Sequence, residues 1–170
     1  MKGQMEFEPD RNFYPDANLT LRVAYGRVGG YQAADAVYHK HYTTIEGIMQ
    51  KDNPDIYDYD IPERLRQLYS DKDYGQWGIN QGTKKSPYIT LPIDFIASNH
   101  TTGGNSGSPL LNGRGELVGL NFDRTWMSTM SDLEFDPEIC RNISVDIRYV
   151  FFVIDKIGGA GYLFDEMTLK

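Results

Sequence analysis

The sequence predicts a mainly β protein: one antiparallel β-barrel with two or three short helices, in a single domain over residues 1–170. Three observations support this class. The length of 170 residues suits one domain with a sizeable core. The 17 glycines and 8 prolines supply the frequent turns of a β protein. Short segments in which apolar and polar residues alternate recur along the chain, as expected of strands with one buried face.

The predicted strands begin after a polar, proline-bearing start. Residues 1–18 predict an arm or loop, and residues 19–26 alternate apolar and polar positions as a strand does. Asn112-Gly113 is a strong turn signal between two later strands. The remaining strands are expected over residues 88–97, which hold one or two of them, and over residues 108–112, 116–123 and 143–146.

Three helices interrupt the β pattern. Thr43 and Glu46 fit a capping box, in which the threonine is the N-cap and the glutamate reaches back to it. Asp60 as a cap, with Pro62 in the first turn, predicts a second helix start. Apolar residues between 147 and 154 recur at helical spacing, although their β propensity is high. The helices are expected near residues 43–50, 60–69 and 147–158, the last packed on the barrel.

Composition excludes several classes of function. The net charge of −7 and the absence of a basic stripe argue against nucleic-acid binding. No apolar run approaches the roughly 20 residues of a membrane helix, and the polar start predicts no signal peptide in this chain. The single cysteine, Cys140, predicts a packed thiol rather than a disulfide. Three histidines without a Cys/His cluster predict no zinc site, and no cofactor is expected.

Residues 102–110, Thr-Gly-Gly-Asn-Ser-Gly-Ser-Pro-Leu, carry the clearest chemical signal of the chain. Gly104 and Gly107 flank Ser106, and glycines there allow a tight turn with positive φ and leave room for a substrate backbone. Ser106 is the predicted nucleophile, and the backbone amides of Gly104 and Ser106 are the predicted oxyanion hole. The string is typical of the nucleophile loop of trypsin-like serine peptidases.

Two alternatives to this interpretation are open. Glycine, asparagine and serine also cluster in ordinary turns, so Gly-x-Ser-Gly by itself is a weak signal. The nucleophile elbow of α/β-hydrolases requires Gly-x-Ser-x-Gly between a strand and a helix. That elbow fits less well, because here the serine is followed by Gly-Ser-Pro and then by an apolar strand.

A serine nucleophile needs a base and a group that orients it. His100 lies six residues before Ser106, in the same predicted barrel, where a loop-stabilising role is the better expectation. His39 and His41 flank Lys40 before a predicted helix cap and are expected to be surface or packing residues. The sequence therefore supplies no convincing base for the serine.

Four segments resemble a group of bacterial exopeptidases, the dipeptidyl peptidase 7/11 family, and lie closest to its Asp/Glu-specific type. The matching motifs cover most of residues 20–160. They are Tyr-Thr-Thr-Ile-Glu-Gly-Ile-Met at 42–49, the serine loop, Gly-Leu-Asn-Phe-Asp-Arg at 119–124 and Asn-Ile-Ser-Val-Asp-Ile-Arg-Tyr at 142–149.

The resemblance implies a fold and an activity. Members of the family have a trypsin-like double barrel with a helical cap and remove dipeptides from free N-termini. Their catalytic His and Asp lie upstream of the serine-bearing barrel, so this chain corresponds to the second barrel alone and is expected to be inactive in isolation. Asp146, which sits between two apolar residues, is therefore not the triad acid; whether it points inward or to solvent stays open.

The resemblance also implies a substrate preference. An arginine at the Arg124 position accompanies preference for Asp or Glu at P1, and a guanidinium pairs bidentately with a carboxylate. Asn121 and Phe122, in the same motif, are expected to contact the substrate. Without the family, Asp123-Arg124 would be interpreted as a charged turn.

Three hypotheses remain. The chain is the serine barrel of an acid-selective dipeptidyl peptidase, a non-catalytic binding or assembly module with the same fold, or a self-sufficient hydrolase that uses His100. The first implies a peptide substrate, the N-terminal barrel and helical cap as partners, and a periplasmic or cell-surface location. A homodimer is also expected, because the apolar face of a lone barrel favours self-association.

Overall fold

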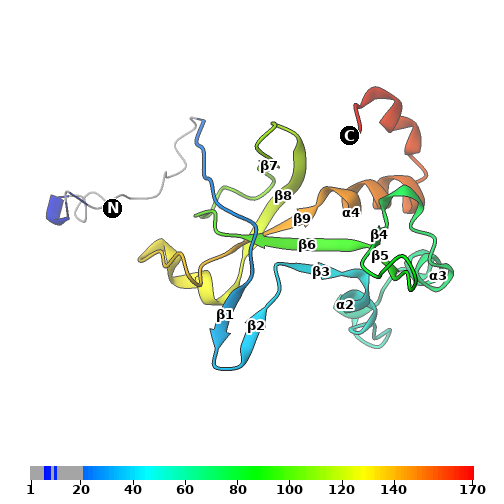
Figure 1. The fold of residues 1–170 in the computed structure, drawn as a ribbon, viewed down its shortest axis with the longest axis horizontal. Helices are drawn as coiled ribbons and strands as arrows, with labels where there is room; N and C mark the ends of the chain where they lie inside the picture. Colours follow the sequence, from blue (N-terminus) through cyan, green and yellow to red (C-terminus); the bar gives the residue numbers. More distant parts are fainter. Residues whose placement is uncertain (1–5, 9, 11–20) are drawn as a thin grey trace.

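A five-stranded antiparallel sheet forms the centre of the computed structural model, which describes residues 6–8, 10 and 21–170. The strand order is β3-β6-β9-β8-β7, with β3 and β7 at the edges (Figure 1). The antiparallel pairing was predicted; closure of the sheet into a barrel stays a prediction. The strands are β3 (Tyr42–Thr44), β6 (Pro92–Ala97), β7 (Pro109–Leu111), β8 (Leu117–Arg124) and β9 (Asn142–Asp146).

The register of the central strands places β9 between β6 and β8. Ser144 of β9 lies opposite Phe95 of β6 and opposite Asn121 of β8. The β8–β9 register shifts between Asn121 and Asp123, so Phe122 has no partner residue on β9. A β-bulge of this kind re-aims side chains beside functional sites, and the serine loop lies next to this one.

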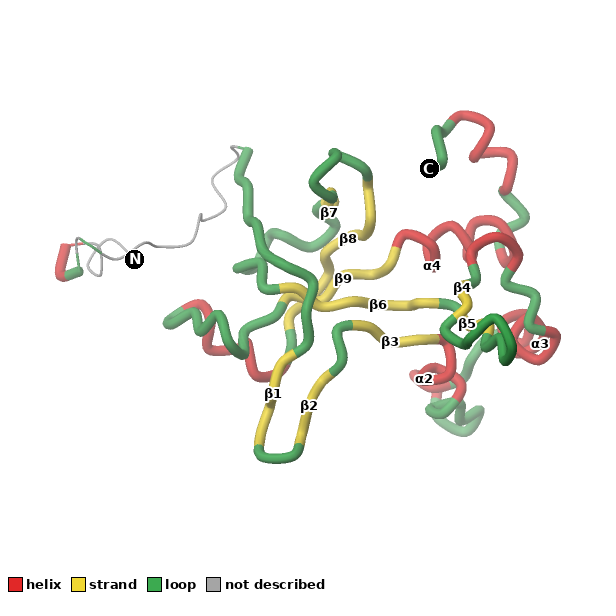
Figure 2. Tube along the Cα trace, in the orientation of Figure 1, coloured by secondary structure: helices red, strands yellow, loops and turns green. Residues whose placement is uncertain are grey.

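The helices gather at one end of the sheet and cover the apolar core (Figure 2). They are α2 (Ile45–Met49), α3 (Glu63–Asp71) and α4 (Ile147–Phe152), and α4 continues as a π-helical stretch, η4 (Val153–Ile157). The last two match the helix predicted near residues 147–158. Aromatic and aliphatic side chains from the helices and from β6 form the core, among them Ile45, Leu68, Tyr74, Trp77, Ile93 and Phe152. Their burial supplies the main stabilising term of the fold.

Smaller elements complete the described chain. A hairpin of β1 (Tyr31–Ala34) and β2 (Val37–His39) projects from the end of the sheet opposite the helices (Figure 1). The other short elements are β4 (Ile79–Asn80), β5 (Ile89–Thr90), and the 3₁₀-helices η1 (Tyr57–Tyr59), η2 (Gly75–Trp77), η3 (Trp126–Asp132) and η5 (Gly161–Glu166). In the described part of the chain, no helix is both long and apolar enough to cross a membrane.

The strand predicted over residues 19–26 is wrong for the part that the structure describes. Residues 21–26 form no strand, and the first β-bridge of this segment joins Val28 to Ala97. The alternating apolar side chains of Leu21, Val23 and Tyr25 are 96, 75 and 88% exposed. A strand requires a neighbouring strand for its backbone groups, whereas here the Ala24 carbonyl accepts a hydrogen bond from the Asn99 side chain at 3.2 Å. The arm predicted over 1–18 lies outside the described residues, except for 6–8 and 10.

Two predicted helix starts also need correction. The N-cap of α2 is Thr44 rather than Thr43, and it makes no side-chain cap bond. The Glu46 carboxylate instead accepts a hydrogen bond from the Thr90 hydroxyl at 2.6 Å, because packing α2 on β5 offers a tertiary partner. Helix α3 begins after Pro62, and Asp60 forms an ion pair with the Arg66 side chain rather than a cap.

Candidate active site

The Ser106 side chain is exposed at the tip of the loop between β6 and β7. Its glycine neighbours have positive φ, 92° at Gly104 and 82° at Gly107, as the sequence predicted. A side chain added at Gly107 would meet nothing within 4 Å. The glycine is therefore required by the backbone conformation of the turn and not by crowding.

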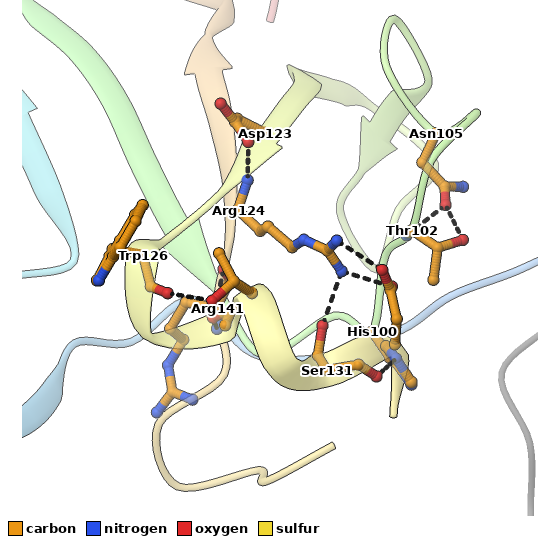
Figure 3. A network of polar contacts seen from close by, with 11 residues as sticks. His100, Thr102, Asn105, Asp123, Arg124, Trp126, Ser131 and Arg141 are labelled. Atoms are coloured by element: carbon orange, nitrogen blue, oxygen red, sulfur yellow. Dashed lines mark hydrogen bonds and ion pairs between the residues drawn. The ribbon is translucent and has the colours of Figure 1, made fainter. Parts of the chain in front are cut away.

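Asn105 closes the loop on itself. Its side-chain Oδ1 accepts a hydrogen bond from the Thr102 amide at 2.9 Å, and its own amide donates to the Thr102 carbonyl at 3.2 Å. The Ser108 amide donates to the Asn105 carbonyl at 3.0 Å. Figure 3 shows the Asn105 and Thr102 side chains facing each other. Asparagine suits this position because its side chain bonds readily to nearby backbone groups.

The loop is docked on strand β8 through Asn121. The Gly107 amide donates to the Asn121 carbonyl at 2.7 Å, and the Asn121 amide donates to the Ser108 carbonyl at 2.9 Å. The Asn121 Nδ2 donates to the Asn105 carbonyl at 3.2 Å, and its Oδ1 accepts from Asn142 at 2.8 Å. Asn121 is 4% exposed. The structure thus places it under the loop as a support, while its contact with substrate stays a prediction.

The loop tip presents one hydroxyl and two backbone amides. The Ser106 hydroxyl donates to the Phe122 carbonyl at 3.2 Å, at the bulge of β8. Within the described residues, the amides of Gly104 and Ser106 donate no hydrogen bond to a protein acceptor. Amides of this kind on an exposed turn are the groups that an oxyanion hole uses. Their role, like that of the serine, remains a prediction.

His100 lies against η3, and its loop-stabilising role stays a prediction. Its Nε2 donates to the Ser131 carbonyl at 2.9 Å, and its ring stacks on Phe135 with centroids 4.3 Å apart. Burial lowers the pKa of His100. His39 and His41 contact aromatic rings on β1 and β3. None of the three histidines forms a hydrogen bond with the loop serine in the part of the chain described.

Arg124 ends strand β8, and its side chain extends toward His100 and Ser131 (Figure 3). Its two terminal nitrogens donate hydrogen bonds to the Asp132 carboxylate, Nη1 to Oδ1 at 2.6 Å and Nη2 to Oδ2 at 2.8 Å. Nη1 also donates to the Ser131 hydroxyl at 3.0 Å. The guanidinium beside Asp132 lowers the pKa of that carboxyl. Sequence reasoning missed Asp132, because nothing in the pattern of 126–132 singles it out.

The pocket beside Arg124 is almost filled. It holds no space of the size of a water molecule, and Oδ1 of the buried Asn142 has no hydrogen-bond donor among the described residues. The lining residues are Asn99, Thr101, Arg124, Ser128, Ser131, Phe135, Cys140, Arg141 and Asn142. A side chain can therefore enter this pocket only if a lining segment moves.

Arg141 organises the wall of this pocket and was not singled out from the sequence. Its side chain is buried and donates to backbone carbonyls on two segments that are far apart in the chain. The acceptors are Gly29, Gly30, Pro137, Glu138 and Cys140. Burial of a charged group is costly unless its donors have hydrogen-bond acceptors, and these carbonyls supply them. Cys140 is a free, buried thiol, as predicted.

Asp146 has a structural role that the sequence left open. It is buried and is the N-cap of α4, where it accepts a hydrogen bond from the Arg148 amide at 2.9 Å. The Arg148 guanidinium also donates to both Asp146 oxygens, at 2.8 and 2.6 Å. These contacts tie the carboxylate to the start of a helix, which is a favourable place for negative charge.

A second hollow, of about 450 Å³, lies between α2, α3, β6 and α4. Its polar lining includes Lys51, Asp58 and Asp94, and burial raises the pKa of Asp94. Within the described residues, no group of three or more His, Cys, Asp or Glu side chains is placed to hold a metal ion. Neither the serine loop nor Arg124 lines this hollow, so it is not the candidate active site.

Comparison with known proteins places this geometry in a family. A family model described as Peptidase S46 matches residues 1–169. The chain is 51% identical over 169 residues to the Asp/Glu-specific dipeptidyl-peptidase of Flavobacterium psychrophilum, covering 99% of the chain and 23% of that relative. It is 46% identical over 169 residues to Dipeptidyl-peptidase 7 of Phocaeicola vulgatus, covering 99% and 22%.

A solved structure gives the same result. The crystal structure of Porphyromonas endodontalis DPP11 in complex with the dipeptide Arg-Asp matches with a TM-score of 0.84 at 41% identity, covering 99% of this chain and 23% of that one. The chain thus spans about a quarter of the length of the relatives it matches. Since the family model covers nearly every residue, the chain belongs to the peptidase S46 family.

Proposed function

We propose that this chain is the serine-bearing part of a dipeptidyl peptidase that releases dipeptides from peptide N-termini and prefers Asp or Glu at P1. The arrangement of strand β8 carries the proposal. Asn121 supports the serine loop, and Arg124 follows on the same strand. One strand thus contacts the loop of the proposed nucleophile and carries the proposed cation.

In the proposed reaction, the Ser106 oxygen attacks the carbonyl carbon of the P1 residue. The negative charge that develops on the carbonyl oxygen is stabilised by the amides of Gly104 and Ser106. The peptide C–N bond then breaks, and the leaving amine takes the proton that the serine lost to a base. Water hydrolyses the ester, which releases the dipeptide and restores the serine.

The base is proposed to come from outside the described residues. The resemblance to the family implies a histidine and an aspartate on an N-terminal barrel and a helical cap over the cleft, both acting as partners of this chain. We further propose that the sheet of this chain is the serine-bearing half of a trypsin-like double barrel, located in the periplasm or at the cell surface. The 170-residue chain by itself is then inactive, because triad members act as a unit.

Two substitutions in the full-length natural protein test the proposal. Ser106→Ala should lower kcat roughly 10⁴- to 10⁶-fold, since the nucleophile is lost. Arg124→Gly should lower kcat/KM for P1 Asp and Glu by an amount worth about 2–5 kcal/mol, because a charge-assisted pair is lost. Activity on apolar P1 residues should survive or rise. Chromogenic dipeptidyl reporters measure both effects, and an unchanged P1 preference in Arg124→Gly would refute the acidic specificity.

A non-catalytic binding or assembly module is the second candidate. It is favoured by one observation: in the described residues, the hydrogen bond of the Ser106 hydroxyl goes to a carbonyl and not to a base. The same assay separates the candidates. A full-length protein that binds peptides but cleaves no reporter, with or without Ser106→Ala, would support the binding module.

A further inference from the structure

The carboxylate of Asp132 is bound to the Arg124 guanidinium, which is the group that an acidic P1 side chain needs. A guanidinium recognises a carboxylate through two parallel N–H donors. The end-on pair of Arg124, Nη1 and Nη2, is already bound to both oxygens of Asp132. Two carboxylates cannot both take this same pair of donors, so a P1 carboxylate that binds end-on must replace that of Asp132.

Asp132 is also placed so that it can be released. Its side chain is 45% exposed, against 24% for that of Arg124, and it lies at the end of the 3₁₀-helix η3. In the described chain, the hydrogen bonds of its carboxylate go to Arg124 alone, whereas Ser131 is held by both Arg124 and His100. Rotation of one exposed side chain into water therefore opens the ion pair while His100 keeps its bond to η3.

The filled pocket gives the second reason for movement. The space beside Arg124 does not admit a water molecule. Its lining includes Ser128 and Ser131 of η3 and Phe135, which follows η3. Entry of a P1 side chain therefore requires these residues to move. The Arg124–Asp132 ion pair is one of the contacts that hold η3 in place (Figure 3).

We infer that Asp132 is a specificity-determining residue that acts as a resident competitor for acidic substrates: its carboxylate holds Arg124 until a P1 carboxylate displaces it. The inference rests on the proposed role of Arg124. An acidic P1 side chain exchanges one ion pair for another, so the guanidinium stays paired. Asp132 thereby lowers the affinity for acidic ligands while it keeps the unliganded pocket neutral.

Binding of the dipeptides Arg-Asp and Arg-Glu to the full-length natural protein tests the inference by calorimetry. Asp132→Asn should lower the Kd for both dipeptides by about three- to tenfold, since the competing charge is gone and partly exposed pairs have modest strength. Asp132→Glu, which keeps a carboxylate, should restore a Kd near that of the wild type. In the Arg124→Gly background, Asp132→Asn should leave the Kd unchanged, because the guanidinium donors for which the two carboxylates compete are absent.

The outcomes separate this inference from the proposed function. If the Kd of Asp132→Asn is unchanged or raised while Arg124→Gly still weakens Arg-Asp binding, the competitor role alone is overturned. A raised Kd would show that Asp132 positions the arginine. If Arg124→Gly leaves the binding of Arg-Asp unchanged, the proposed specificity fails together with the inference. Circular dichroism and thermal melting establish that each variant is folded.

Discussion

At the scale of single residues, Asn121 joins the serine loop to two strands of the sheet. It bonds the serine loop through its amide, its carbonyl and its side chain, and it accepts from Asn142. A neutral amide can do this because it offers donors and an acceptor without the desolvation cost of a charge. The position of the Ser106 hydroxyl thus depends on a buried asparagine that does not touch it.

Removal of this amide should destabilise the chain. Asn121→Ala removes one partner each from Asn142 and the Asn105 carbonyl, which keep the Ser144 hydroxyl and the Ser108 amide. The net loss of a hydrogen bond costs about 0.5–1.5 kcal/mol of unfolding free energy. Urea denaturation measures the loss. Ser106→Ala, which changes an exposed side chain of the same loop, is the matched control and should stay within about 0.5 kcal/mol. Equal stability of the two variants would show that Asn121 does not hold the loop.

At the scale of elements, η3 connects the serine-loop segment to the pocket. His100 precedes the loop and bonds to η3 through Ser131, while Arg124 bonds to η3 through Asp132. The short helix is therefore held from two sides, by one neutral ring and one ion pair. Burial favours the neutral imidazole and lowers the pKa of His100, although the hydrogen bond to the Ser131 carbonyl acts in the opposite direction.

Acid should lower the stability of the folded state through the burial of His100. Because the folded state lowers the pKa of His100 below its ordinary value of 6.5, the unfolded chain binds more protons. The stability from His100 is present above pH 6.5 and is lost as the pH falls through that value toward the lower, folded pKa. The Tm of the wild type should thus drop more between pH 7.5 and 5.5 than that of His100→Gln.

A second histidine variant controls for other titrating groups. His39→Gln, which replaces an exposed histidine on β2, is the matched control. Calorimetric scans of the three proteins at the same ionic strength give the comparison. The coupling through His100 is excluded if both variants show the same drop in Tm as the wild type.

At the scale of the whole molecule, the two ends of the sheet differ in their burial of apolar side chains. The helices cover one end with a closed core, whereas the segment before β1 exposes Leu21, Val23 and Tyr25 (Figure 1). Trp126 at the start of η3 is likewise exposed. Exposed apolar patches of this kind mark surfaces that associate.

The isolated 170-residue chain is therefore expected to form a dimer or a larger oligomer. Replacement of Leu21 and Val23 by Ser should shift it toward the monomer, because less apolar surface is then available for burial. Tyr57→Ser, at an equally exposed residue of η1, should leave the association unchanged. Light scattering over a concentration series measures the mass. A wild-type chain that stays monomeric at high concentration contradicts this prediction.

Sequence reasoning was most accurate where the cause of a structure is local. The positive φ of Gly104 and Gly107 follows from their place beside Ser106, and the strands of 88–97, 108–112, 116–123 and 143–146 appear as β5 to β9. It was wrong at residues 21–26, where the alternation was strand-like but no described segment pairs with it. It also missed the β1–β2 hairpin and β3, since three- and four-residue strands carry little periodic signal.

The sequence by itself determined the family, the serine loop and the arginine that follows it, because those features lie in contiguous motifs whose chemistry can be read residue by residue. Only the tertiary structure decided what surrounds them. Asp132 is eight residues from Arg124 and reaches it through a 3₁₀ turn. Asn142 supports the loop from the neighbouring strand. Such contacts depend on strand register and on the path of the chain between elements, and neither is encoded in a local pattern.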